Sequence, residues 1–204
     1  MGRRSDHSRD ELYVMALDAA ESIVREDGFP ALTARKVAAR IGYTAGTLYN
    51  IFRNQDDLII HLNARTLGRL DAEMRQVGLS GNPRTDIPAL GRAYVGFIND
   101  NAELWHVLFD HRLADGLELP DWYVARIDRM MAMVEDALSP LFPIDAFETR
   151  RSSARMLWSA VHGVCSLSTS GKLGIVSDVP LMETVDRLIT VLLQGMATTD
   201  TETR

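Results

Sequence analysis

The 204-residue chain has too few cysteines for a disulfide framework or a zinc finger, and it has no apolar run long enough to span a membrane. It contains one cysteine, so no disulfide can form within the chain and no Cys-x-x-Cys pair is available for zinc or redox chemistry. No apolar run approaches the roughly 18 residues that a membrane-spanning helix needs. The first ten residues are charged and no apolar segment follows them, so we expect no secretory signal. We therefore expect a soluble, cytoplasmic protein that needs no cofactor and does not engage a membrane.

Signatures of catalysis are also scarce. The chain has neither a glycine-rich phosphate loop nor a Gly-x-Ser-x-Gly motif. Cys165 lies in an apolar stretch, where a thiol is inert. His106 and Asp110 are four residues apart in a helical stretch and His111 is adjacent, so a helical metal enzyme is one alternative. Without a further convergent ligand in the sequence, we expect no catalytic residue and no metal site.

Charge is unevenly distributed along the chain. The net charge is −6, yet residues 1–54 carry eight basic and seven acidic side chains, so the excess of acid lies in residues 55–204. Between Gly28 and Gln55 four basic residues occur and no acidic one. Because salt screens charges that are more than about 10 Å apart at 0.1 M ionic strength, a local basic surface can attract nucleic acid on an acidic protein.

Almost every segment repeats its apolar residues at helical spacing, and no strand-like alternation persists. Glycines, prolines and capping residues divide these segments, which predicts an all-α protein of about nine helices. The helix expected from Asp145 to about Lys172 is apolar around much of its circumference. Such a helix must be buried on more than one side, either at the centre of a large core or between its own core and a second subunit.

A helix-turn-helix is predicted in residues 33–52, with its second helix running from Ala45 to about Phe52. A threonine that can cap a helix precedes each of two short helices, and Gly42 lets the chain reverse between them. In this motif the N-terminal end of the second helix enters the DNA major groove. Small residues at the start of the second helix permit close approach to the bases. Leu48 and Phe52 are expected to anchor this helix on the core of the motif.

The same residues resemble the tetracycline-repressor (TetR) family. The resemblance rests on the run Leu-Thr-Ala-Arg-Lys-Val-Ala-Ala-Arg-Ile-Gly-Tyr-Thr-Ala-Gly-Thr-Leu-Tyr-Asn-Ile-Phe at 32–52, followed by Asp57 and Leu58, and covers about residues 10–62. It implies a homodimeric regulator that binds a palindromic operator in double-stranded DNA and blocks access to the promoter. It also implies release by an unidentified small molecule. The residues themselves leave repression and activation open.

Two positions depart from the family pattern. Ile51 stands where an aromatic residue is usual, and Gln55 stands where a lysine usually meets a phosphate. Loss of that charge predicts a slightly weaker salt dependence of DNA binding, for which Arg53 can compensate. A binding protein whose motif no longer engages DNA is therefore a second alternative. The expected DNA contacts are Thr33, Arg35, Lys36, Thr44, Ala45, Gly46, Thr47, Tyr49, Asn50, Arg53 and Gln55.

The C-terminal half resembles TetR-like domains named WHG for Trp-His-Gly, here Trp158, His162 and Gly163. This resemblance implies that the helix lies beside a ligand cavity and in the dimer interface. We expect a head at 1–54, a connecting fourth helix at 55–77, and an effector-binding and dimerisation body at 78–204. Aromatic and methionine side chains suit a largely apolar ligand, although each could equally belong to the core. The expected ligand-binding residues are Trp105, Phe109, Trp122, Met130, Met131, Trp158 and His162.

Overall fold

A computed structural model describes residues 7–113 and 118–199 of the chain. Part of the charged N-terminal segment and part of the loop expected at 113–120 therefore lie outside the described residues. Every regular element within them is helical, which confirms the all-α prediction, with ten α-helices where about nine were expected. No helix among these residues is long and apolar enough to cross a membrane.

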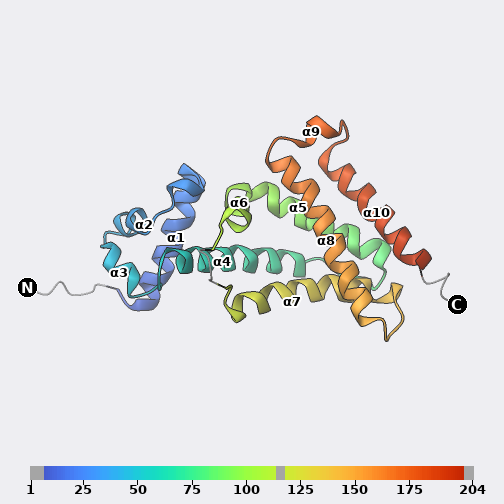
Figure 1. Cartoon of the computed structure of the whole chain (residues 1–204), viewed down its shortest axis with the longest axis horizontal. Coiled ribbons are helices and arrows are strands. Elements are labelled where there is room, and N and C mark those ends of the chain that lie inside the picture. Colours follow the sequence, from blue (N-terminus) through green and yellow to red (C-terminus); the bar gives the residue numbers. More distant parts are fainter. Residues whose placement is uncertain (1–6, 114–117, 200–204) are drawn as a thin grey trace, which may run out of the picture. The chain divides into compact units, whose positions relative to one another are not determined.

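The helices follow one another along the chain as labelled in Figure 1. They are α1 (Arg9–Asp27), α2 (Ala34–Arg40), α3 (Ala45–Tyr49), α4 (Gln55–Arg75), α5 (Pro83–Asp100), α6 (Ala102–Asp110), α7 (Asp121–Leu138), α8 (Phe147–Thr169), α9 (Leu173–Val176) and α10 (Leu181–Thr199), with short 3-10 turns η1 (Phe29–Ala31) and η2 (Ser139–Leu141).

The chain forms two compact units. The first comprises residues 1–68 and 101–123, and the second comprises residues 69–100 and 124–204. The first unit therefore holds α1 to α3, most of α4, and α6, whereas the second holds α5, α8, α9 and α10. Helices α4 and α7 each contribute residues to both units.

In the first unit, α1 is fixed at both ends by local chemistry. Ser8 accepts a hydrogen bond from the Glu11 amide, and Glu11 accepts one from the Ser8 amide, so the two residues form a capping box. Gly28 ends the helix with φ at 78°, a conformation that glycine adopts without a steric penalty. The buried face of α1 packs into a core built with α2, Leu48, Phe52, the start of α4 and α6.

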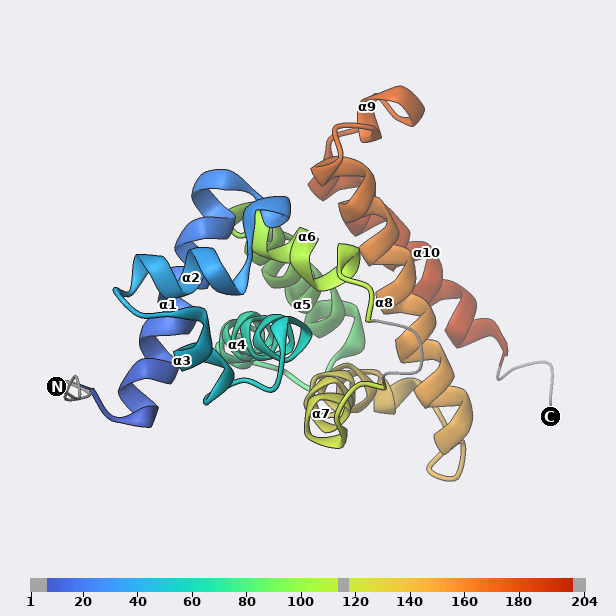
Figure 2. The same cartoon turned by 60° about the vertical axis from the view of Figure 1, so that its left-hand side comes forward.

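In the second unit, α10 packs against both α5 and α8, and α8 and α10 run side by side in Figures 1 and 2. Helix α5 begins at Pro83, and Asp86 accepts hydrogen bonds from the amides of Ser80 and Gly81 just before it. The long helix expected after Asp145 is α8. Its buried residues are Ala154, Leu157, Val161 and Cys165.

Candidate nucleic-acid interface and ligand cavity

The two helices of the predicted motif begin and end as their sequence indicates. The Thr33 hydroxyl accepts a hydrogen bond from the Lys36 amide at 3.2 Å and thereby caps α2. Gly42 follows with φ at 79°, and the Tyr43 amide then donates to the Ala38 carbonyl at 2.8 Å. A residue with a Cβ would be strained at position 42. Gly42 thus supplies the reversal between α2 and α3.

The second helix of the motif, α3, is shorter than expected. The Thr44 hydroxyl accepts from the Thr47 amide at 3.4 Å and caps the helix, but α3 ends at Tyr49 instead of near Phe52. The amides of Asn50 and Ile51 bond to carbonyls three residues earlier, so the last turn tightens and the α-helix stops. Helix α3 therefore comprises only residues Ala45–Tyr49.

The burial of this segment separates an anchoring face from an exposed face. Leu48 and Phe52 are buried in the same cluster as Val37 and Ala38, which confirms the expected anchor. Tyr49 is 51% exposed. Thr44, Gly46 and Asn50 are exposed as well. The side chains expected to meet DNA thus share the outer side of α3.

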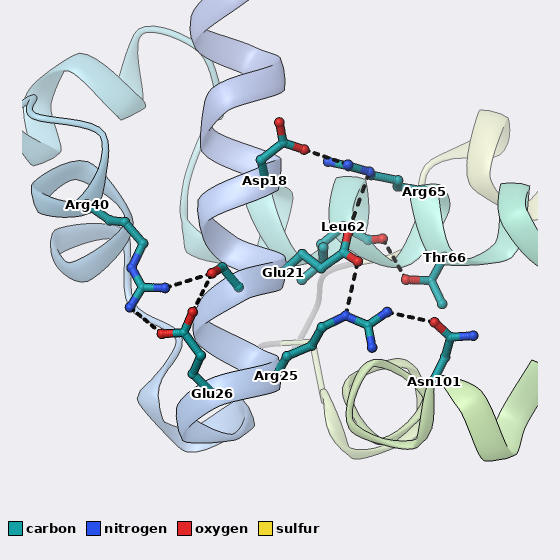
Figure 3. Close-up of polar contacts among 10 residues, drawn as sticks. Asp18, Glu21, Arg25, Glu26, Arg40, Leu62, Arg65, Thr66 and Asn101 are labelled. Carbon is teal, nitrogen blue, oxygen red and sulfur yellow. Dashed lines mark hydrogen bonds and ion pairs between the residues drawn. The ribbon is translucent and has the colours of Figure 1, made fainter.

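Two of the basic side chains on α2 are already paired with acids. The Lys36 ammonium lies 2.7 Å from the Asp27 carboxylate, and the Arg40 guanidinium lies 2.8 Å from the Glu26 carboxylate, as Figure 3 shows for the latter pair. Arg35 is exposed. These acids stand at the end of α1, just before the acid-free window of the sequence. A count by sequence position therefore missed their proximity.

Arg53 is held at the start of α4. Its guanidinium lies 3.1 Å from the Asp57 carboxylate, and its backbone amide donates to the same group at 2.8 Å. Burial raises the pKa of Asp57, but the hydrogen bonds from Arg53 outweigh it and the pKa is lowered. The carboxylate consequently stays charged beside Arg53. A phosphate would have to compete with this carboxylate for the guanidinium.

Gln55, the departure from the family pattern, bonds to the start of α2. Its Nε2 donates to the Leu32 carbonyl at 3.2 Å, and its Oε1 accepts from the Ala34 amide at 3.4 Å. Both partners flank the Thr33 cap. The side chain that lacks a lysine's charge therefore links the first residue of α4 to the N-terminus of α2.

Helix α1 is joined to the rest of the first unit by a polar network (Figure 3). Arg65 of α4 forms ion pairs with Asp18 and Glu21 of α1. Arg25 bonds to Glu21 and donates to Asn101, the residue before α6, at 2.7 Å. These contacts fix α1 against α4 and α6 and thereby stabilise the unit that contains the helix-turn-helix motif.

An aromatic cluster that the sequence did not indicate surrounds His61 of α4. The imidazole stacks on Trp122 with ring centres 5.0 Å apart, and its Nδ1 lies 3.1 Å from the Tyr13 hydroxyl. Phe52 also contacts the ring edge-on. Burial lowers the pKa of His61, although the charge of Asp57 opposes it. Trp122, expected at a ligand site, thus lies in the first unit against His61.

The other nominated ligand residues divide between the two units. Trp105 is buried in α6 and contacts Phe109, which is 43% exposed, and both belong to the first unit. Met130, Met131 and Trp158 line a cavity within the second unit. The complete lining is Met74, Ile87, Leu90, Gly91, Tyr94, Met130, Met131, Val134, Leu157, Trp158, Val161 and Ile189.

His162 lies behind this cavity and not in its lining. Its ring stacks on Trp158 with centres 5.1 Å apart, and its Nδ1 lies 3.1 Å from the Tyr94 hydroxyl. Tyr94 and Gly91 could not be singled out from the sequence, because helical spacing marks both only as residues of the inner face of α5. No sequence signal distinguishes such a face from a cavity wall.

The residues considered for a metal site are arranged in two pairs. His106 Nδ1 lies 3.8 Å from Asp110 on α6, and His111 Nε2 lies 2.8 Å from Asp56 of α4. Among the described residues, no group of three His, Cys, Asp or Glu side chains could hold a metal ion. His111 instead connects the end of α6 to the first turn of α4.

Comparison with known proteins gives matches over both halves of the chain. Residues 16–62 match the profile of bacterial regulatory proteins of the tetR family, and residues 87–192 match the tetracyclin repressor-like C-terminal domain. A fatty acid metabolism regulator protein from Bacillus subtilis (strain 168) is 30% identical over 64 residues, 31% of this chain. The matched segment spans about a third of that protein, 33% of its length.

Solved structures share the fold over nearly the full chain. A protein of unknown function from Rhodococcus sp. RHA1 is 22% identical with a TM-score of 0.75, covering 96% of this chain and 100% of that one. A TetR-like transcriptional regulator from the same organism is 19% identical with a TM-score of 0.63, covering 94% of this chain and 98% of that one. At these identities the likeness establishes the helical architecture.

Proposed function

The chain belongs to the TetR family of bacterial regulatory proteins, and from this premise we propose that it is a transcriptional repressor released from a palindromic operator by a small, largely apolar ligand. It would act in the cytoplasm, with a DNA-binding head at 1–54, a connecting helix at 55–77 and an effector-binding body at 78–204. The observation that carries the proposal is α3. Its apolar side is anchored by Leu48 and Phe52, and its outer side offers small and hydroxyl-bearing residues.

In the proposed complex the N-terminal end of α3 enters the major groove. Ala45 and Gly46 let the backbone approach the bases, and the Thr47 hydroxyl and methyl meet a base edge or a phosphate. Tyr49 and Asn50 contact phosphates, which fixes the register of the head on the duplex and not its sequence preference. Arg35, Lys36 and Arg53 add charge around this centre.

The proposed homodimer pairs α8 and α10 with the same helices of a second copy. The outer side of α8 carries Met156 and Leu167, which are 51% and 37% exposed, and α10 carries Val191, which is 63% exposed. Gly163, the glycine of the WHG-like pattern, has open space where a Cβ would lie, so a partner helix could approach closely. Two-fold symmetry would then set the recognition helices roughly 34 Å apart, one turn of DNA.

The proposed coupling between ligand and DNA runs along α4. This helix contributes Met74 to the cavity, and at its other end Gln55 bonds to the start of α2. A ligand that displaced Met74 would shift the helix that holds α2 in place. Coupling of this kind is typically about 1–3 kcal/mol, a 5- to 150-fold change in affinity.

DNA binding is tested by fluorescence anisotropy on the region upstream of the protein's own gene and on random DNA of equal length. We expect tighter binding to the upstream region, and Tyr49→Phe should weaken binding to both DNAs alike because it removes a phosphate contact. A Tyr49→Phe variant with altered sequence preference would refute the phosphate assignment. No binding to any upstream fragment at low salt would favour a binding protein that has lost DNA recognition.

The dimer is tested by sedimentation of Val191→Glu, which places a charge in the proposed interface. We expect monomers at concentrations where the wild type is dimeric, because a buried unpaired carboxylate is strongly unfavourable. Val14→Glu is the matched control, because Val14 is 53% exposed on α1 of the first unit. Dimers of unchanged strength in Val191→Glu would place the interface elsewhere.

A further inference from the structure

Apolar side chains make up most of the wall of the cavity in the second unit. Helices α4, α5, α7, α8 and α10 each contribute to it, and its volume is about 50 Å³, so a ligand of more than a few atoms must displace part of its wall. Three methionines, Met74, Met130 and Met131, lie in its wall. Because their side chains are unbranched and flexible, they can repack around ligands of different outline.

None of the described residues that line the cavity is acidic or basic. Burial raises the pKa of the Tyr94 hydroxyl and lowers the pKa of His162 behind it. Both groups are therefore uncharged at neutral pH. Burial also raises the pKa of Cys165, one turn further along α8, to about 11, so this thiol stays protonated. The cavity and its backing are electrically neutral.

Two cations on the lining helices are engaged with acids. Arg155 of α8 lies 2.8 Å from Glu135 and 3.1 Å from Asp128 of α7, so one guanidinium faces two carboxylates. Arg92 of α5 lies 3.1 Å from Asp186 of α10. A carboxylate or phosphate entering the cavity would find no cation among the described residues of its wall, and Arg155 and Arg92 are already paired with acids.

Tyr94 contributes the only side-chain oxygen among the described residues that line the cavity. Its hydroxyl lies 3.1 Å from His162 Nδ1 and is also hydrogen-bonded with Trp158. With its proton on Nδ1, the imidazole donates to the phenol oxygen, and the hydroxyl can donate to an acceptor on a ligand. A ligand that reaches this hydroxyl would need one oxygen acceptor on an otherwise apolar molecule.

We propose that the effector is an uncharged, mainly hydrocarbon molecule with one oxygen acceptor, such as a ketone or ester, that binds the Tyr94 hydroxyl. This inference rests on the proposed function, since it names the class of ligand for the same cavity. Burying a carboxylate or an ammonium group without a counter-ion is costly. A neutral oxygen bound to Tyr94 avoids that cost.

Gly91 provides a steric test of the site. A Cβ at this position would lie 2.5 Å from Cδ1 of Ile189, so that side chain would have to shift. Both residues line the cavity. The atom that must move is the end of a flexible side chain, so Gly91→Ala should fold while the cavity loses space. Gly96→Ala on the same helix is the matched control, because its Cβ would meet nothing within 4 Å.

The experiment uses calorimetric titration of the full-length protein at pH 7.5 with three probes of one chain length: decan-2-one, decanoate and decylamine. We expect the ketone to bind at least tenfold more tightly than either ion. Tyr94→Phe should weaken ketone binding about fivefold or more, in line with the loss of one hydrogen bond. Gly91→Ala should weaken it as well, whereas Gly96→Ala should not. Melting curves check that each variant is folded.

Three results would overturn the proposal: decanoate or decylamine binding as tightly as the ketone, an unchanged affinity in Tyr94→Phe, or no binding of any probe. DNA release is measured on the same samples by anisotropy. A ketone that binds without releasing DNA supports this ligand class and contradicts ligand-controlled repression. A charged probe that binds best and releases DNA contradicts this ligand class and supports ligand-controlled repression.

Discussion

Replacing Gln55 by lysine tests what the departure from the family pattern does. The change introduces the positive charge of the family pattern at the start of α4 and removes the side-chain amide that bonds to the Leu32 carbonyl and the Ala34 amide. Two opposite effects should follow. DNA binding gains a phosphate contact, while the junction between α2 and α4 loses its link.

The magnitudes can be worked from the structure. The two hydrogen bonds, at 3.2 and 3.4 Å, are long and partly exposed, so their loss should lower the free energy of unfolding by about 1 kcal/mol in total. A positive charge in the first turn of α4 adds up to about 0.5 kcal/mol of destabilisation. Each new phosphate contact steepens the slope of log affinity against log salt by about 0.9, hence about 1.8 for a dimer.

Urea unfolding measures the change in the free energy of unfolding. Anisotropy on the bound DNA between 50 and 300 mM salt measures the change in the salt slope. Gln55→Met is the matched control, since it keeps the length of the side chain but has neither the charge nor the amide. It should lose the same hydrogen-bond contribution and leave the salt slope unchanged. An unchanged slope in Gln55→Lys would refute a phosphate near position 55. Full stability in Gln55→Met would refute the link to α2.

Three further predictions concern the first unit. Asp27→Asn should raise DNA affinity by about twofold at low salt, because Lys36 then binds a phosphate without first breaking its exposed ion pair with Asp27. Anisotropy measures this affinity, and a lower affinity in the variant would contradict the prediction. Gly42→Ala should lower the free energy of unfolding by about 1–2 kcal/mol through left-handed strain, whereas Gly46→Ala should stabilise the helix yet weaken DNA binding. Because burial lowers the pKa of His61, the folded state binds that proton less readily than the unfolded chain, so stability should fall as pH drops below about 6.5. Urea titrations at pH 7.5 and 5.5 should show a smaller fall in His61→Gln, and an equal fall would assign the effect to other groups.

The helix-turn-helix could be predicted because its determinants are local. The caps at Thr33 and Thr44 and the reversal at Gly42 act within a few residues of themselves, so the sequence displays them directly. The end of α3 was misplaced by about three residues because Phe52 keeps helical spacing although the chain has already left the helix. Apolar spacing records which side is buried and not whether the backbone between is helical.

The cavity was harder to predict because cavity walls and core use the same side chains. Met130, Met131 and Trp158 were expected and do line it, whereas Trp105 and Trp122 belong to the other unit. Which aromatic residues face the cavity depends on contacts between distant segments, as with Tyr94 and His162. The pairing of Lys36 with Asp27 could not be predicted from the sequence for the same reason, since it joins two helices across a turn.

The pairing of Lys36 with Asp27 bears on how fast the protein would find a specific DNA site. A genome presents an enormous excess of random sites, and every unpaired lysine or arginine lengthens the stay on each of them through counterion release. In this head, Lys36 and Arg53 form ion pairs with carboxylates. They would leave these carboxylates for DNA phosphates only where the whole surface of α3 fits the DNA. The carboxylates would thereby shorten the residence time on non-specific sequences. A protein with less net attraction for DNA could then search a longer stretch of DNA in a given time.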